Sequence, residues 1–240
     1  MYDPAVTITL TRERDGRVAR VRFDNAGRGN CFSTATLDAL VDLLEAAAAD
    51  DDCAVVRLEM AGRHFCTGWD TSSFADLRDA TAESVAADLR HSDEAVSRIR
   101  RLPVPVVAAV RGRVIGFGAG LLAAVHLPVA ADDVQLSLPE ARFGFAPAGV
   151  GHAIGRALPR PLALDLLLGA TTATTATLHA WGLVARVVPA DDVDGEVDRL
   201  AEPLLAVPGP TVRAVVEVVA SDTPERAYEI SARTIVSRGV

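Results

Sequence analysis

The sequence predicts an α/β fold with a largely parallel sheet, and two observations support this prediction. Strand-like, loop and helix-like segments recur along the chain from residue 6 to residue 237. The segment Val104–Ala109 contains only apolar residues and proline, a pattern typical of a strand buried on both faces. Strands that alternate with helices form parallel sheets, whose ligands bind at the carboxyl ends of the strands. We therefore expect the functional site at that edge.

Periodicity and capping residues place the individual elements. Two alternating segments joined by a polar turn predict a β-hairpin at the amino end, and Ser33 is a suitable cap for the helix after it. The expected strands are 6–10, 18–23, 54–60, 104–109, 129–131, 134–138 and 183–188. The expected helices are 33–49, helical structure over 72–101, a helix beginning near 121, 151–158, 161–168, one from 174 or 177 to 182, 191–207, 211–219 and 224–237.

Composition limits the classes of function. The 240 residues are half hydrophobic, which suits one large domain with a sizeable core. A net charge of −8 without a basic patch argues against nucleic acid as a partner. Every basic residue is arginine, so a lysine Schiff base or lysine general base is excluded. Cys31, Cys53 and Cys66 lack metal-ligand spacing and favour reduced thiols. With no signal-peptide pattern and no long apolar run, we expect a cytoplasmic protein that does not enter a membrane.

A glycine-rich turn follows the buried segment at 104–109. Gly116, Gly118 and Gly120 precede a helical stretch, and glycines at such a junction let a ligand approach the backbone. The unpaired N–H groups at the start of a helix suit a phosphate or a developing oxyanion. Close helix packing is an alternative explanation of these glycines. A dinucleotide site is disfavoured because the spacing is not G-x-G-x-x-G.

Four segments are informative because of their order along the chain. They are Arg63–Asp70, the glycine turn, Leu136–Ala148 and Ala180–Val188. Together they resemble the crotonase (enoyl-CoA hydratase/isomerase) superfamily over roughly residues 5 to 220. The resemblance implies a spiral core of ββα repeats over residues 1–190, which binds and transforms the thioester. It also implies a helical trimerisation region over residues 191–240, and hence a homotrimer or hexamer.

The resemblance also implies the chemistry. Acyl thioesters bind with their carbonyl between two backbone N–H groups and react through an enolate. By position these donors are the N–H groups of Trp69 and Phe117, whose large side chains are expected to crowd the acyl pocket. One of the two hydratase carboxylates maps onto Glu140, a candidate general acid/base. The other maps onto Gly120 and is missing.

Further residues that lie in these segments or elsewhere in nearby loops are assigned to the site. His152 and His64 are candidates for a second acid/base because histidine titrates near neutrality. We assign Arg28, Cys66, Gly68, Asp70 and Gly116 to binding of the thioester cofactor, with Arg28 contacting a phosphate. Cys66 is not expected to be a nucleophile. Arg142 is a further polar candidate, and His126 and His179 are expected to be structural.

The reaction expected from these residues is the hydration or dehydration of an enoyl or β-hydroxyacyl thioester, carried by coenzyme A or by an acyl carrier protein. No other cofactor is required. Gly118-x-Gly120 and the segment Ser137–Ala148 are similar to the dehydratases of polyketide β-branching, which act on hydroxymethylglutaryl groups. A double-bond isomerase that uses Glu140 alone, or a catalytically weak scaffold, are the alternatives. The related decarboxylase branch is disfavoured by the absence of lysine.

Overall fold

A computed structural model describes residues 6–72, 80–169 and 172–237 of the chain. Its main sheet has six strands in the order β1-β2-β3-β4-β6-β9. Only β1 and β2 pair antiparallel, and every other neighbouring pair is parallel. The prediction of an amino-terminal hairpin followed by a parallel sheet is thus confirmed. The strand bounds are β1 Thr7–Glu13, β2 Val18–Asp24, β3 Val55–Met60, β4 Val106–Val110, β6 Leu127–Ala131 and β9 Arg186–Val188.

A second, three-stranded sheet has the order β5-β7-β8 and lies where the sequence predicted only one strand. Its strands are β5 Arg113–Ile115, β7 Gln135–Ser137 and β8 Ala173–Thr174. The expected turn after β4 is therefore shorter than predicted, because β5 begins directly after Gly112. The next helix, α3 (Phe117–Ala124), begins four residues earlier than expected and contains Gly118 and Gly120. A three-residue strand has too little periodicity to be recognised from its own residues.

The helices agree with the predicted order. Ser33 caps α1 through the Thr36 N–H, as expected. Of the helical structure expected over 72–101, α2 forms the part from Ala82, and residues 73–79 lie outside the described residues. Helix α4 begins at Ala148, three residues earlier than expected. The remaining bounds are α1 Thr34–Ala49, α2 Ala82–Arg100, α4 Ala148–Ala157, α5 Arg160–Leu168, α6 Thr175–Ala180, α7 Val193–Leu205, α8 Gly209–Ala220 and α9 Pro224–Ser237, with short 3-10 turns η1 Ala26–Arg28, η3 Glu140–Phe143 and η4 Ala190–Asp192.

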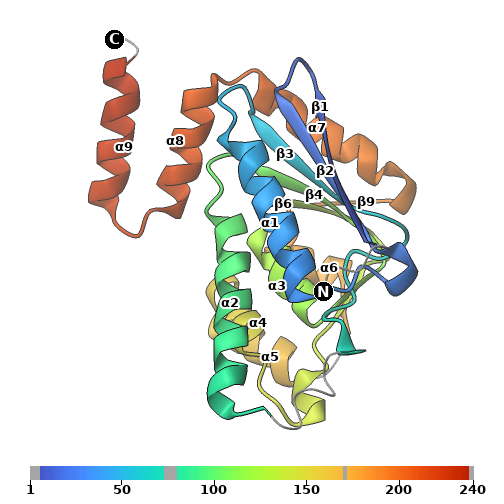
Figure 1. Ribbon diagram of the computed structural model, residues 1–240. Helices are drawn as coiled ribbons and strands as arrows, with labels where there is room; N and C mark the ends of the chain where they lie inside the picture. The colour runs from blue at the N-terminus through green and yellow to red at the C-terminus, as the bar shows by residue number, and fades with distance from the viewer. Residues whose placement is uncertain (1–5, 73–79, 170–171, 238–240) are drawn as a thin grey trace.

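Helices cover both faces of the main sheet (Figure 1). Helix α1 packs on β1, β2 and β3 and in turn supports α2, whereas α7 packs on β3, β4 and β6 from the opposite side. The inward stripe of α1, which includes Leu37, Leu40 and Leu44, has no exposed surface. These three layers bury the main core and hold the strand ends in place.

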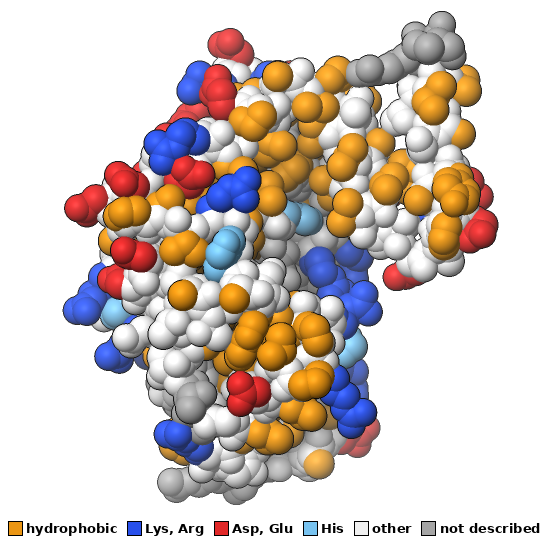
Figure 2. Space-filling view, turned by 180° about the vertical axis from the view of Figure 1, so that it is seen from behind, with side chains coloured by type: hydrophobic (Ala, Val, Ile, Leu, Met, Phe, Trp, Pro, Cys, Tyr) orange, Lys and Arg blue, Asp and Glu red, His pale blue; other side chains and the backbone are white. Residues whose placement is uncertain are grey.

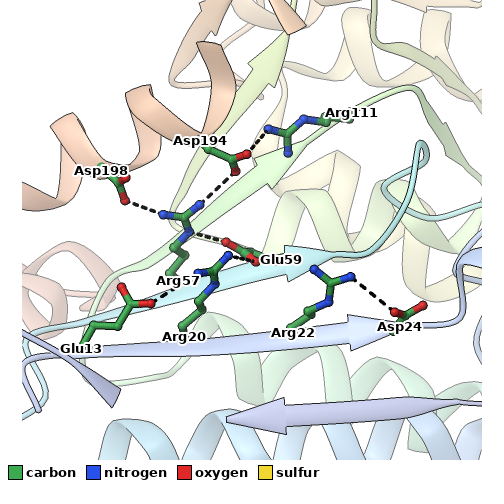
Figure 3. A network of polar contacts seen from close by, with 9 residues as sticks. All are labelled: Glu13, Arg20, Arg22, Asp24, Arg57, Glu59, Arg111, Asp194 and Asp198. Atoms are coloured by element: carbon green, nitrogen blue, oxygen red, sulfur yellow. Dashed lines mark hydrogen bonds and ion pairs between the residues drawn. The ribbon is translucent and has the colours of Figure 1, made fainter. Parts of the chain in front are cut away.

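An ion network around the buried Arg57 joins α7 to the sheet (Figure 3). Arg57 of β3 is only 6% exposed, and its guanidinium lies 2.6 Å from Glu59 and 2.9 Å from Asp194 of α7. It also bonds Asp198, one turn further along α7. Arg111 reaches Asp194 as well, at 2.9 Å. Arg57 and Glu59 form the buried part of the network, whereas the Asp194 and Asp198 side chains are more than half exposed, so the pairs with α7 orient this helix and add little stability.

The last two helices pack against each other and stand apart from the sheet layers (Figure 1). Their apolar side chains form an exposed surface (Figure 2) that includes Val215, Val219, Tyr228, Ile235 and Val236. Within the described ranges, no helix is by itself both long and apolar enough to cross a membrane. The segments Ala190–Leu205 and Gly209–Ala220 reach that length and composition only as a pair, with a bend of 108° between them.

Candidate functional site

Two backbone segments meet at the carboxyl end of the sheet. Cys66 forms a parallel bridge with Val114 of β5, in which the Ile115 N–H donates to the Cys66 carbonyl at 2.9 Å. Three residues further along each segment lie Trp69 and Phe117, whose ring centroids are 4.3 Å apart. The bridge therefore brings together the two residues that the resemblance assigns as oxyanion donors.

Each of these two residues follows a glycine with positive φ. Gly68 has φ of 104° and Gly116 has φ of 53°, conformations that a side chain would strain. Among the described residues, neither the Trp69 N–H nor the Phe117 N–H donates a hydrogen bond. Phe117 is also the first residue of α3, where the helix dipole favours negative charge. The site thus offers two backbone donors of the kind that stabilises an oxyanion.

The carboxyl group of Glu140 lies beside Gly116, the residue that precedes the Phe117 donor. Glu140 begins η3 just after β7, and a Cβ built on Gly116 would be 2.7 Å from its Oε1. Its Oε2 is buried and has no hydrogen-bond partner among the described residues. Burial raises the pKa of Glu140 above its ordinary value, because desolvation disfavours the carboxylate. A partly buried carboxyl group with a raised pKa suits a general acid/base.

The position of the missing second carboxylate faces α4. A Cβ on Gly120 would meet Val150 Cγ2 at 3.4 Å, so Val150 occupies the space beyond this glycine. The crowding expected from Phe117 is not seen, because its ring is 5% exposed and packs against Phe32 and Trp69. The aromatic ring of Phe117 is therefore part of the core.

The residues assigned to the cofactor lie around the same two segments. Arg28 forms a bidentate pair with Asp70 at 2.8 and 2.6 Å, which closes η1 onto the segment that carries Trp69. Cys66 is fully buried, and its Sγ accepts the Gly68 N–H at 3.4 Å. Burial raises the pKa of the Cys66 thiol to about 12, in agreement with its expected lack of nucleophilic character. Gly68 and Gly116 set the backbone directions described above.

The histidines are spread over the fold. His152 is exposed on α4, and His64 accepts the Arg113 N–H on Nδ1 at 3.2 Å. Burial, together with Arg63 and Arg113, lowers the pKa of His64. His126 accepts the Val106 N–H and binds the Arg100 carbonyl, while His179 bonds the Val184 carbonyl, so both play the structural part expected of them. Arg142 is exposed on η3.

Two residues that support the site, Asn30 and Phe32, are not indicated by any sequence motif. Asn30 has no exposed surface and φ of 56°, and its amide nitrogen donates to the Ala61 and His64 carbonyls at 2.7 Å. Phe32 bonds the backbone on both sides of Trp69. Only the meeting of residues 25–33 with residues 61–70 reveals these roles.

Two other kinds of site are metal centres and enclosed cavities. No cluster of three or more potential metal ligands is found among His, Cys, Asp and Glu side chains in the part of the chain described. A polar cavity of about 370 Å³ lies on the α7 side of the sheet. Its arginines Arg20, Arg22 and Arg111 are each paired with an acidic residue, and none of the assigned site residues lines it. The residues around Glu140 are therefore the main candidate.

The comparisons agree with this geometry. The family model described as enoyl-CoA hydratase/isomerase matches residues 13–235. The chain belongs to this family. It is 33% identical over 218 residues to "(7aS)-7a-methyl-1,5-dioxo-2,3,5,6,7,7a-hexahydro-1H-indene-carboxyl-CoA hydrolase" of Mycobacterium tuberculosis, a match that covers 88% of this chain and 83% of that protein. It is 29% identical to "Enoyl-CoA hydratase domain-containing protein 3, mitochondrial" of Mus musculus, covering 81% of this chain but only 64% of the mouse protein.

Solved structures of the family share the fold. An enoyl-CoA hydratase of Mycobacterium smegmatis superposes with a TM-score of 0.86 at 24% identity, over 98% of this chain and 91% of that chain. An enoyl-CoA hydratase from Polaromonas sp. JS666 gives 0.84 at 27% identity, over 96% and 90%. The expected crotonase-like fold is thereby confirmed.

Proposed function

We propose that this family member is a lyase that hydrates or dehydrates an enoyl or β-hydroxyacyl thioester through an enolate. One observation carries the proposal: Glu140, whose buried Oε2 has no hydrogen-bond partner among the described residues, lies against Gly116, and the N–H groups of the next residue, Phe117, and of Trp69 donate no hydrogen bond there either. Such donors stabilise the negative charge that develops on a thioester oxygen. A proton acceptor at the same place can remove the α-proton that creates this charge.

The proposed dehydration needs only one carboxyl group. The Glu140 carboxylate takes the α-proton, and the electron pair moves onto the thioester oxygen between the Trp69 and Phe117 N–H groups. The enolate then expels the β-hydroxyl group, which takes the proton from Glu140 and leaves as water. The carboxylate is restored, and the reverse sequence adds water to the enoyl thioester. Val150 beside Gly120 is consistent with a site that works without a second carboxylate there.

A double-bond isomerase is the second candidate, and the absence of a carboxylate at Gly120 is the observation that favours it. Glu140 then removes a proton from one carbon and returns it to another, with no bond to oxygen broken. The two reactions share the enolate, so the substrate decides between them. A catalytically weak scaffold is the third possibility that the missing carboxylate raises.

We propose that the acyl group of the substrate is a thioester of coenzyme A or of the phosphopantetheine of a carrier protein, and that no further cofactor is needed. Arg28 forms an ion pair with Asp70, the last residue of the 61–70 segment. These two residues are the proposed contacts for the coenzyme A or phosphopantetheine. A hydroxymethylglutaryl group of the polyketide β-branching type is the specific substrate to test first. Equal or faster turnover on a carrier protein than on CoA supports that assignment, and turnover of the CoA form alone contradicts it.

The deciding experiment compares Glu140→Gln with the wild type on a panel of acyl-CoA and acyl-carrier-protein substrates, followed by intact-mass analysis. A positioned acid/base contributes about 10²- to 10⁴-fold, so kcat is expected to fall at least ~100-fold with little change in substrate binding. Glu202→Gln is the matched control, because Glu202 is an exposed carboxylate on α7. If Glu140→Gln keeps more than about a tenth of the wild-type kcat, another group moves the proton, and His152→Asn is the next variant to measure.

A further inference from the structure

We propose that Phe32 is a positioning residue that holds the two oxyanion donors at their working separation. The proposal rests on the proposed function, since it concerns the same two N–H groups. Phe32 has no exposed surface and therefore touches no substrate. It is, however, in contact with both donor segments, which are far apart in the sequence.

The backbone of Phe32 sets the direction of the first donor. Its N–H donates to the Gly68 carbonyl at 3.0 Å, and its carbonyl accepts the Asp70 N–H at 2.7 Å. In a parallel bridge, the residue between these two bonds turns its own N–H away from the partner strand. Trp69 is that residue, and Phe32 is its bridge partner. The two hydrogen bonds thus hold the Trp69 N–H on the side opposite to Phe32.

The ring of Phe32 supports the second donor. It meets the ring of Phe117 edge to face, with centroids 5.6 Å apart, and Phe117 in turn lies against Trp69 at 4.3 Å. On its other side the Phe32 ring stacks on Phe23 of β2 at 4.3 Å. Phe32 therefore fills the space behind the first residue of α3. Without the ring, the start of α3 can move toward the core and away from the thioester oxygen.

The structure also supplies a matched control. Phe23 and Phe32 are both fully buried and stack on each other, but Phe23 has no ring contact with Phe117 or Trp69. Phe23→Leu and Phe32→Leu remove the same atoms from the same part of the core. Their melting temperatures are expected to fall by similar amounts, so a loss of stability alone cannot distinguish them. Only Phe32→Leu removes support from a donor.

The experiment measures kinetics and the hydrogen bonds to the bound carbonyl. We expect Phe32→Leu to lower kcat about tenfold or more and to leave KM within about twofold, because misplacing a catalytic group by about 1 Å costs up to ~10²-fold. Phe23→Leu is expected to keep kcat within about twofold. The infrared C=O stretch of a carbonyl-labelled, saturated butanoyl-CoA is then recorded on each protein. It is expected to move toward its frequency in water with Phe32→Leu only.

The outcomes separate this inference from the proposed function. If the wild type binds the probe, offered as butanoyl-CoA or on a carrier protein, and does not lower the stretch relative to water, the Trp69 and Phe117 N–H groups are not donors, and the proposed function is contradicted. Failure to bind either form contradicts it as well. If the wild type lowers it and Phe32→Leu leaves both the stretch and kcat unchanged, only the role of Phe32 is overturned. Equal losses of kcat in Phe23→Leu and Phe32→Leu also overturn it. Should Phe32→Leu fail to fold, Phe32→Met keeps more of the volume, lacks the flat ring and is measured in the same way.

Discussion

Gly116→Ala tests the contact between the glycine turn and Glu140. The added carbon would lie 2.7 Å from Glu140 Oε1, and Gly116 has φ of 53°. Gly116 combines this φ with ψ of −117°, a sparsely populated conformation that costs a side chain about 1–3 kcal/mol, which for a chain of this size corresponds to a loss of about 2–12 °C in Tm. In addition, the carboxyl group must move by roughly 0.5–1 Å to relieve the contact, and such a displacement costs up to ~10²-fold in rate.

Gly144→Ala is the control that separates these two effects. Gly144 also has positive φ, 84°, and ends the same 3-10 turn as Glu140, but a Cβ there would meet nothing within 4 Å. Both variants are expected to lose Tm by differential scanning calorimetry, Gly116→Ala more than Gly144→Ala, because ψ is −117° at Gly116 and 16° at Gly144. Only Gly116→Ala is expected to lose kcat. Combining Gly116→Ala with Glu140→Gln should add little further loss, because both changes act on one group. Equal kcat values for Gly116→Ala and Gly144→Ala would refute the reasoning.

Three further predictions concern pH, the second carboxylate and assembly. Burial raises the folded pKa of Glu140 above its ordinary 4.5, so wild-type stability falls as pH rises through the window between the two values. The Tm of Glu140→Gln minus the Tm of the wild type should therefore increase above about pH 4.5 and then level off. A difference in Tm that does not change with pH contradicts this prediction. Gly120→Glu should not yield a faster hydratase, because Val150 stands 3.4 Å from the new Cβ; a gain in hydration kcat would show that this space is free. Static light scattering should give a trimer or hexamer, since Val219 and Tyr228 are 82% and 71% exposed on the apolar surface of α8 and α9, and a monomer at micromolar concentration argues against it.

Local signals in the sequence were sufficient for most of the fold. The Ser33 cap, the alternation in the hairpin and the apolar segment after Val104 each specify an element through neighbouring residues, and each is confirmed. The early start of α3 was missed, because it depends on a distant contact. A Cβ on Gly118 would lie 2.5 Å from the Cys66 carbonyl oxygen, so this glycine permits a close approach that only the folded chain displays.

In the assigned site, too, some residues were predictable from local motifs and others depend on distant contacts. The motif resemblance singled out Glu140 and the two donor positions, and the structure brings all three together. The residues behind them, Asn30 and Phe32, act through carbonyls and rings contributed by other segments. Their importance has no local pattern, since a buried Asn and a buried Phe are equally expected in any core loop.

A site built from backbone N–H groups explains why likeness of fold and likeness of sequence separate so widely in this family. Any side chain leaves its own N–H available, so Trp69 and Phe117 can serve in the same backbone geometry as smaller residues. What must be kept is the path of the chain: the bridge from Cys66 to Val114 and the glycines at 68 and 116. A TM-score of 0.84 at 27% identity shows a fold that is kept although most residues differ. Under the proposed function, the type of reaction then depends on the side chains next to this backbone, which place a carboxyl group at Glu140 and none at Gly120.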